Sequence, residues 1–234
     1  MSITLYFRQF FILLMLFGLG GLLPFVFNQG VASAYHFKSS YYLNAWEGKT
    51  TVDEIEYRDA YSAALNAYER DSLSPHYRIR LSKVMEWGVY LGFDSFSNDE
   101  FNTLLSGAIA LRHNWPSAYS DYGFNLAFYQ DKPDLAFEQL RIGLEYGPFE
   151  PEVIQKILTI GFAYWSTLSM DDKYLVFESL KLAPTMNNAT RNHLVKSVSL
   201  YDKKSLVCSY YSYLPEPLPE NTANWIAHNL CKTT

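Results

Sequence analysis

The stretch ALRHNWPSAYSDYGFNLAFYQDKPDLAFEQLRIGLEYGPFEP, residues 110–151, decides the fold. It predicts one helix over about 116–129 and a second that stops at Gly147-Pro148, with the turn 131–134 between them. Such a hairpin cannot bury its apolar faces alone, so we expect further copies stacked on either side.

The hairpin recurs along the chain. Pro75, Pro116, Pro148 and Pro184 follow one another at intervals of roughly 30 to 40 residues, near the period of two-helix repeats. A small residue followed by Leu precedes three of these prolines, as in a degenerate tetratricopeptide (TPR) repeat. Only the unit around Ala136, Gly143 and Pro148 matches the TPR spacing well, and its first helix lacks the expected Trp and Gly.

Helices are also predicted on both sides of the central hairpin. Apolar residues from Tyr57 to Tyr68 recur at helical spacing, Ser74-Pro75 opens a helix that stops at Gly92, and Ser97 opens the next. The helix from Glu152 to about Trp165 is apolar on two sides, as expected for an interior helix of an array. Another is capped at Ser169 and ends at Ala183-Pro184. We therefore expect an all-α fold, an N-terminal membrane helix followed by a TPR-like stack of antiparallel helical hairpins.

The N-terminus carries a membrane segment. Residues 10–27 are uncharged and almost wholly apolar, and as a helix they would rise about 27 Å, close to the thickness of the bilayer core. The length favours an uncleaved anchor, while Ala32-Ser33-Ala34 leaves a cleaved signal peptide as the alternative. With Arg8 the only charge before Ala34, the positive-inside rule predicts that the chain beyond about Asn28 is exported.

Three regions follow from these patterns. Residues 1–34 are the anchor or signal segment, 35–200 the helical repeat domain, and 201–234 a proline-rich linker with a capping helix. Residues 36–49 are interpreted as an aromatic, irregular lead into the folded part. Cys208 and Cys231 are the chain's two cysteines, and in an exported protein they form either a disulfide or a pair of buried thiols.

Composition and motifs exclude several function classes. The net charge of −5 leaves no basic surface for nucleic acid. The five histidines are widely separated without metal-ligand spacing, so we expect neither a metal nor a cofactor. Because there is no GxSxG elbow, P-loop or GxGxxG, covalent hydrolase and nucleotide-using activities are not expected. Neighbouring acidic residues are read as helix-start charges, not as catalytic pairs.

Aromatic residues are the remaining candidates for a binding site, since the chain holds 19 Tyr, 16 Phe and 5 Trp. Exposed rings can hold sugars through contacts with their C–H faces, although most of these rings fall on stripes that are expected to be buried. Four of them flank the turns of the central hairpin and are the predicted binding residues: Trp115, Tyr119, Tyr122 and Phe149.

The central segment resembles a known family. The succession of Ala110-Leu111-Arg112, Trp115-Pro116, Asn125-Leu126-Ala127, residues 147–151 and a Gly-Phe-Ala-x-Trp at 161–165 is similar to the VpsP-type polysaccharide-biosynthesis family. The resemblance covers about residues 104–182, with Asn114 and Phe149 departing from the pattern. It implies a small exported or inner-membrane-anchored accessory protein of a Gram-negative bacterium, in exopolysaccharide biosynthesis or export, and it implies no known reaction.

The expected function is therefore non-enzymatic. We expect a single-pass inner-membrane protein whose periplasmic helical repeat contacts other proteins of the polysaccharide machinery, with the polysaccharide itself as a further possible ligand; cleavage of the signal would make it soluble in the periplasm. Two alternatives stay open: a periplasmic polysaccharide-modifying enzyme with unrecognised carboxylates, and a general scaffold for secretion or envelope maintenance.

Overall fold

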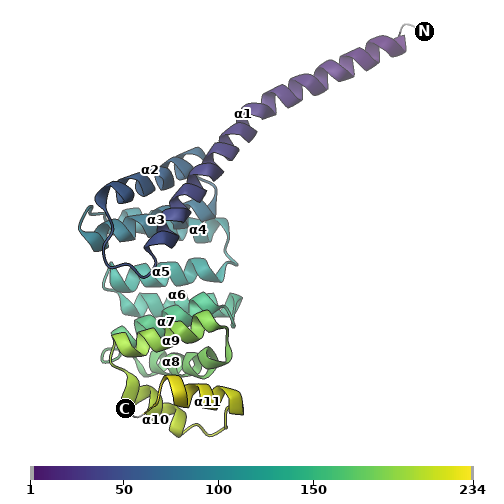
Figure 1. The fold of residues 1–234 in the computed structure, drawn as a ribbon. Helices are drawn as coiled ribbons and strands as arrows, with labels where there is room; N and C mark the ends of the chain where they lie inside the picture. The colour runs from purple at the N-terminus through teal and green to yellow at the C-terminus, as the bar shows by residue number, and fades with distance from the viewer. Residues whose placement is uncertain (1–2, 233–234) are drawn as a thin grey trace. The chain divides into compact units, whose positions relative to one another are not determined.

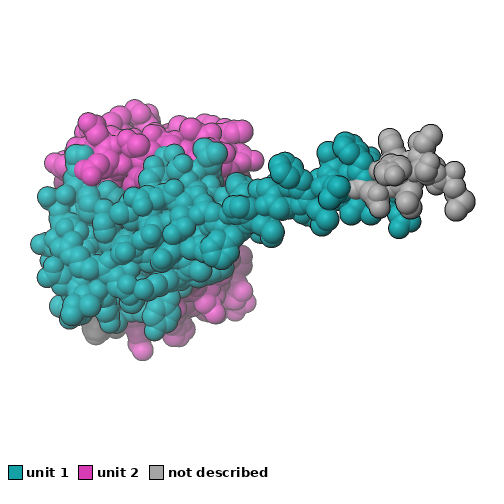
Figure 2. All heavy atoms as spheres, turned by 90° about the horizontal axis from the view of Figure 1, so that it is seen from above, with its two compact units in different colours: residues 1–97 teal, residues 98–234 magenta. Residues whose placement is uncertain are grey.

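The computed structural model describes residues 3–232, and within that range the chain forms eleven α-helices, one short 3-10 helix and no strand (Figure 1). The all-α fold class is confirmed. The chain divides into two compact units, residues 1–97 and 98–234, which are coloured separately in Figure 2. This boundary falls inside the stretch 35–200 that was expected to form the repeat domain.

The first unit contains three helices: α1 (Ile3–Trp46), α2 (Glu54–Arg70) and α3 (Pro75–Leu91). Helix α1 has 44 residues and is therefore about 66 Å long. Every residue from Phe10 to Phe27 is exposed, and α1 is long and apolar enough to cross a membrane. The interpretation of residues 36–49 as irregular is wrong for residues 36–46, because the same helix continues unbroken to Trp46, and only the turn 47–49 is irregular.

The second half of α1 is helical because it has a partner. Ala32, Ser39 and Trp46, seven residues apart, are fully buried along one side of α1. The buried members are small, polar and then very large, so they do not form the continuous apolar stripe that sequence patterns reveal. Polar contacts also hold α1 and α2 together, because Lys38 Nζ and Tyr42 Oη each lie 2.6 Å from a carboxylate oxygen of Asp59.

Helices α1 and α2 run antiparallel. Asn28 of α1 pairs with Arg70 at the end of α2, whereas Nε1 of Trp46 donates to Glu56 in the first turn of α2 at 3.3 Å. Tyr57 of α2 is fully buried against α3, where Gly88 makes room for it. A Cβ on Gly88 would lie 2.1 Å from Tyr57 Oη. The first unit is thus a three-helix assembly that includes the continuation of the apolar stretch of α1.

The second unit holds the remaining α-helices in chain order, and its core includes Phe137, Leu140, Ile157 and Leu180. Helix α5 contacts both α6 and α7, and α7 contacts both α8 and α9. Contacts between a helix and the next but one are typical of stacked hairpins. The helices are α4 (Asn98–Leu111), α5 (Pro116–Phe128), α6 (Pro133–Tyr146), α7 (Pro151–Ala163), α8 (Met170–Leu182), α9 (Asn188–Leu200), α10 (Lys204–Ser212) and α11 (Glu220–Asn229).

The helix boundaries follow the signals in the sequence. Proline occupies the first turn of α3, α5, α6 and α7, where its missing N–H costs nothing. Ser169 caps α8 by accepting a hydrogen bond from Asp172 N, and Gly92 ends α3 with a positive φ of 74°. Ser74 stands at the expected cap position of α3 but makes no side-chain capping bond, so proline alone marks that start.

The C-terminal region differs in one respect from its expectation. Residues 201–234 include a helix, α10, that the sequence patterns did not predict, ahead of the proline-rich segment and α11. Cys208 of α10 and Cys231 after α11 are joined by a disulfide, with their Cα atoms 5.6 Å apart. The bridge fastens the chain terminus to the last hairpin.

Candidate functional site

The central hairpin places its aromatic residues at the start of α5. The turn after α6 packs on that start because Gly147 has no side chain, and a Cβ there would lie 2.6 Å from Cγ of Pro116. Gly143, one turn earlier in α6, approaches the carbonyl oxygen of Pro116 and Cβ of Tyr119 in the same way. The small residues of α6 therefore bring the α6–α7 turn against the first turn of α5.

Three aromatic rings meet at this junction. Tyr119 is buried, with 6% of its surface exposed, and its hydroxyl donates to the carbonyl oxygen of His113 at 2.8 Å. The Tyr146 ring stacks on Tyr119 with centroids 5.8 Å apart and meets the His113 ring edge-on, with centroids 6.3 Å apart. Burial, with a smaller contribution from Tyr146, raises the pKa of Tyr119, so its hydroxyl stays protonated and remains a donor.

Trp115 and Phe149 extend the junction toward solvent. Trp115 is half-buried at the N-cap of α5, and the Arg112 guanidinium lies over its ring, 5.2 Å from the centroid. Phe149 projects from the α6–α7 turn and is 70% exposed. We call this group of residues the aromatic edge: Arg112, His113, Trp115, Tyr119, Tyr146 and Phe149.

Tyr122 does not belong to the aromatic edge. Its hydroxyl donates to Oδ1 of Asn102 in α4 at 3.1 Å. Nε2 of Gln130 donates to the same Asn102 oxygen at 2.8 Å and to Oδ1 of Asn125 at 3.0 Å. Because Asn125 is fully buried, this network satisfies polar groups inside the α4–α5 packing and is a structural feature.

The four residues singled out from the sequence thus have different environments. Trp115 and Phe149 have solvent-facing surface, Tyr119 is buried and stacks on Tyr146, and Tyr122 lies in a separate, partly buried network. Sequence patterns missed Tyr146, which is 47% exposed and completes the edge. Its position as the last residue of a helix, directly before Gly147, is the signal that could have identified it.

The aromatic edge offers groups that bind through noncovalent contacts. It offers ring faces and a guanidinium, which suit apolar side chains, carbonyl oxygens and sugar C–H faces. Across residues 3–232, no three His, Cys, Asp or Glu side chains come together as a metal site would require. The buried carboxylate of Asp172 is occupied by an ion pair with Arg141 and by the Ser169 hydroxyl at 2.6 Å.

A second feature lies at the C-terminal end of the second unit. A cavity of about 400 Å³, within the size range of small-molecule sites, is lined mainly by apolar side chains of α10, α11 and the segment between them. Tyr211, Leu218 and Ile226 form part of its wall, together with the disulfide of Cys208 and Cys231. The cavity contains none of the sequence-predicted binding residues.

Comparisons with known proteins do not identify a family for this chain. No protein-family model matches the chain, and no curated protein matches it.

Proposed function

We propose that this protein is a non-enzymatic, membrane-anchored accessory component of exopolysaccharide biosynthesis or export, and that its helical domain contacts other proteins of that machinery at the outer face of the inner membrane. The observation that carries the proposal is the continuity of α1. An apolar segment long enough to span the bilayer leads without a loop into a folded helical unit.

The packing of α1 favours the anchor over the cleaved signal. Ala32, within the small-residue motif, is fully buried, and Asn28 is hydrogen-bonded to α2. Cleavage after Ala34 would remove both residues from the first unit and cut a helix in its middle. The likeness of residues 104–182 to VpsP-type proteins supports the polysaccharide assignment. Arg8 and the amino terminus precede the span and no early basic cluster follows it, which supports a periplasmic domain.

The aromatic edge is the proposed contact surface. Exposed aromatic rings beside an Arg are enriched where proteins bind partners. Phe149 and Tyr146 supply accessible ring surface, and the buried Tyr119 stacks against the Tyr146 ring. We expect Phe149→Ala to lower polysaccharide output without changing thermal stability, because its ring is mostly in solvent. Tyr213→Ala, at an 86% exposed ring of the C-terminal region, is the matched control and should leave output unchanged.

The anchoring role is tested by replacing the apolar segment while keeping the part of α1 that packs in the first unit. Residues 1–27 are replaced by a cleavable signal, which keeps Asn28 and Ala32 and thus the first unit intact. In a second strain the same residues are replaced by an unrelated transmembrane helix. We expect polysaccharide output to fall in the first strain and to recover in the second. Full output from the soluble form would show that anchoring is not needed.

The absence of enzymatic activity is tested separately. Purified full-length protein is incubated with the polymer that the host produces, and the products are analysed by size and by mass. We expect no change in the polymer. Reproducible cleavage or modification that is lost when a single carboxylate is substituted would replace this proposal with an enzymatic one.

A further inference from the structure

The inference concerns the loop between α2 and α3, residues 71–74, and it rests on the proposed anchoring by α1. The contacts between Asn28 and Arg70 fix where this loop lies along α1. Nδ2 of Asn28 donates to the carbonyl oxygen of Arg70 at 3.0 Å, and Nη1 of Arg70 donates back to Oδ1 of Asn28 at 2.9 Å. Asn28 directly follows the last residue of the apolar stretch, Phe27.

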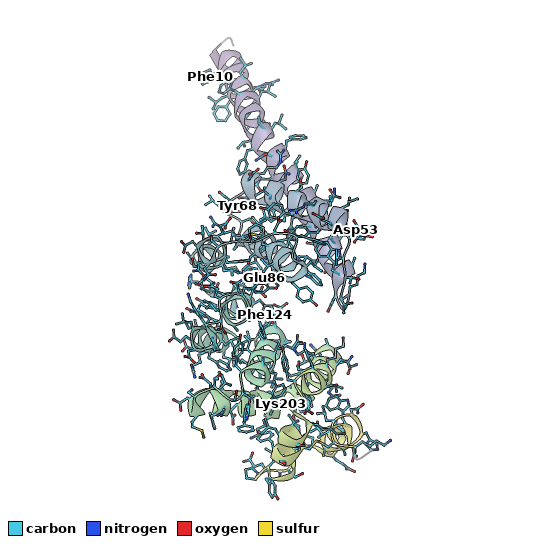
Figure 3. All side chains as sticks on the ribbon, turned by 90° about the vertical axis from the view of Figure 1, so that its left-hand side faces the viewer. Phe10, Asp53, Tyr68, Glu86, Phe124 and Lys203 are labelled. Carbon is cyan, nitrogen blue, oxygen red and sulfur yellow. A yellow bond between two sulfur atoms is a disulfide. The ribbon has the colours of Figure 1, made fainter. Side chains whose placement is uncertain are left out.

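The direction of α2 carries the loop toward the membrane. Because α2 runs antiparallel to α1, its C-terminal end points toward the apolar stretch of α1 and its N-terminal end points away (Figure 3). Tyr68 and Asp53 mark these two ends in the figure. The headgroup layer on each side of a bilayer is about 5 to 8 Å thick, comparable to one helical turn. A loop that continues past Arg70 therefore enters this layer.

The side chains at this end suit the headgroup layer. Leu73 is 71% exposed at the tip of the loop, with no protein surface covering most of it. Behind it, the Arg70 guanidinium lies over the Tyr35 ring at 5.7 Å and the Arg78 guanidinium over the Tyr68 ring at 5.3 Å. Tyr and Arg concentrate at membrane interfaces, where an apolar body and a polar tip are both solvated.

We propose that the α2–α3 loop docks into the lipid headgroup layer, with Leu73 inserted toward the acyl chains, so that the first unit has a second membrane contact beside the span. The occupant of this surface is the bilayer in which α1 itself is embedded. Two contacts, one through α1 and one through Leu73, hold the first unit against the bilayer surface.

The test uses full-length protein in lipid nanodiscs of phosphatidylethanolamine and phosphatidylglycerol, with an environment-sensitive fluorophore on single introduced cysteines. The native cysteines are bridged and do not react with the label. Leu73→Cys reports on the loop, and Phe17→Cys, 86% exposed within the apolar stretch, reports on the span. Ile55→Cys is the matched control, a 79% exposed aliphatic position at the opposite end of α2.

Quenching by nitroxide-labelled lipids separates the outcomes. We expect blue-shifted, quenched emission at positions 17 and 73 and unquenched emission at position 55. If the label at position 17 is quenched but the label at position 73 gives the same emission as the control at position 55, the docking of the loop is overturned and the anchor remains supported. This holds whether both of those labels are quenched or neither is. Absence of quenching at 17 would overturn the anchor and the docking together.

Discussion

Gly161 of α7 and Val176 of α8 approach so closely that a Cβ on Gly161 would lie 2.3 Å from Cγ2 of Val176. Val176 is fully buried and β-branched, so its methyl group cannot rotate away freely. The contact between α7 and α8 therefore depends on the absence of a side chain at position 161. Two neighbouring helices of the second unit are held at this spacing by one residue.

Gly161→Ala is expected to destabilise the second unit by about 1 to 2 kcal/mol, because overpacking costs about 1 to 3 kcal/mol and outweighs the better helix propensity of Ala. Hydrogen exchange of α7 and α8 in the full-length protein measures the change. Gly30→Ala, at an open position of α1, is the control and should be neutral or slightly stabilising. Unchanged protection in Gly161→Ala would mean that α8 shifts without cost.

Arg141→Ala is expected to cost about 2 to 3 kcal/mol. Asp172 is buried, with 4% of its surface exposed, and loses its cationic partner when Arg141 is truncated. Lys181→Ala removes an exposed ion pair with Glu216, 3.4 Å long, and should cost less than about 0.5 kcal/mol. Chemical denaturation of the two variants compares them directly. Equal losses of unfolding free energy in the two variants would show that the burial of Asp172 does not strengthen its ion pair with Arg141.

Trp46→Ala is expected to release the second half of α1 from the first unit, at a cost of about 3 to 5 kcal/mol. The indole is fully buried, contacts the Trp87 ring edge-on at 5.6 Å and donates to Glu56. Limited proteolysis should then cut between residues 30 and 46, a stretch that is helical in the parent protein and is expected to resist cleavage there. Tyr41→Ala, on the exposed side of the same helix, should leave the protection intact.

The stability of the first unit is expected to fall as the pH drops below about 6.5. Burial, reinforced by Arg80 and His76, lowers the pKa of His36 to about 4, so the unfolded chain binds a proton that the folded chain does not. The stabilisation is complete above pH 6.5 and decreases by about 1 kcal/mol toward pH 5, after allowance for solvent screening.

His36→Gln should remove this slope. The difference between parent and variant isolates His36, because the pKa of His193 in the second unit is also lowered, mainly by burial, and titrates in both proteins. Chemical denaturation at several pH values between 5 and 8 gives the two curves. Parallel curves would mean that His36 is protonated equally in the folded and unfolded chain.

Reduction of the disulfide is expected to lower the stability of the C-terminal end by about 3 kcal/mol, since the bridge joins two residues that are 23 apart in the sequence. A paired Cys208→Ser and Cys231→Ser variant should behave like the reduced protein. Hydrogen exchange of α11 is the measurement, with α5 as an internal reference in the same molecule. Equal protection of α11 with and without the bridge would show that packing alone holds it.

The sequence was most informative where proline and glycine act locally. Pro116, Pro151 and Gly92 mark helix ends through backbone constraints that do not depend on distant partners. The continuation of α1 was missed because it depends on tertiary partners. Ser39 and Trp46 are buried by α2 and α3, but a Ser and a Trp do not form the apolar stripe by which a buried helix face is recognised in a sequence.

In the candidate site, too, local features are predictable from the sequence, whereas features that depend on tertiary partners are not. Trp115 and Phe149 are predicted from their positions beside the turns of the central hairpin, and both have accessible surface. Tyr119 and Tyr122 lie three residues apart, about one turn of α5, but end in different environments, one stacked on Tyr146 and one bonded to Asn102. Close approaches between helices, such as that of Gly147 to Pro116, decide which ring is covered. They depend on the packing of two helices and cannot be read from one segment of sequence.

The unbroken passage of α1 from the apolar stretch into the first unit has a mechanical consequence. A flexible linker would let the domain adopt any orientation above the bilayer, whereas a continuous helix transmits its tilt to whatever is packed on it. A helix with a fixed apolar length tilts more in a thin bilayer than in a thick one. With α1 spanning the bilayer as proposed, the orientation of the first unit relative to the membrane normal is expected to respond to bilayer thickness, and α1 would then act as a lever as well as an anchor.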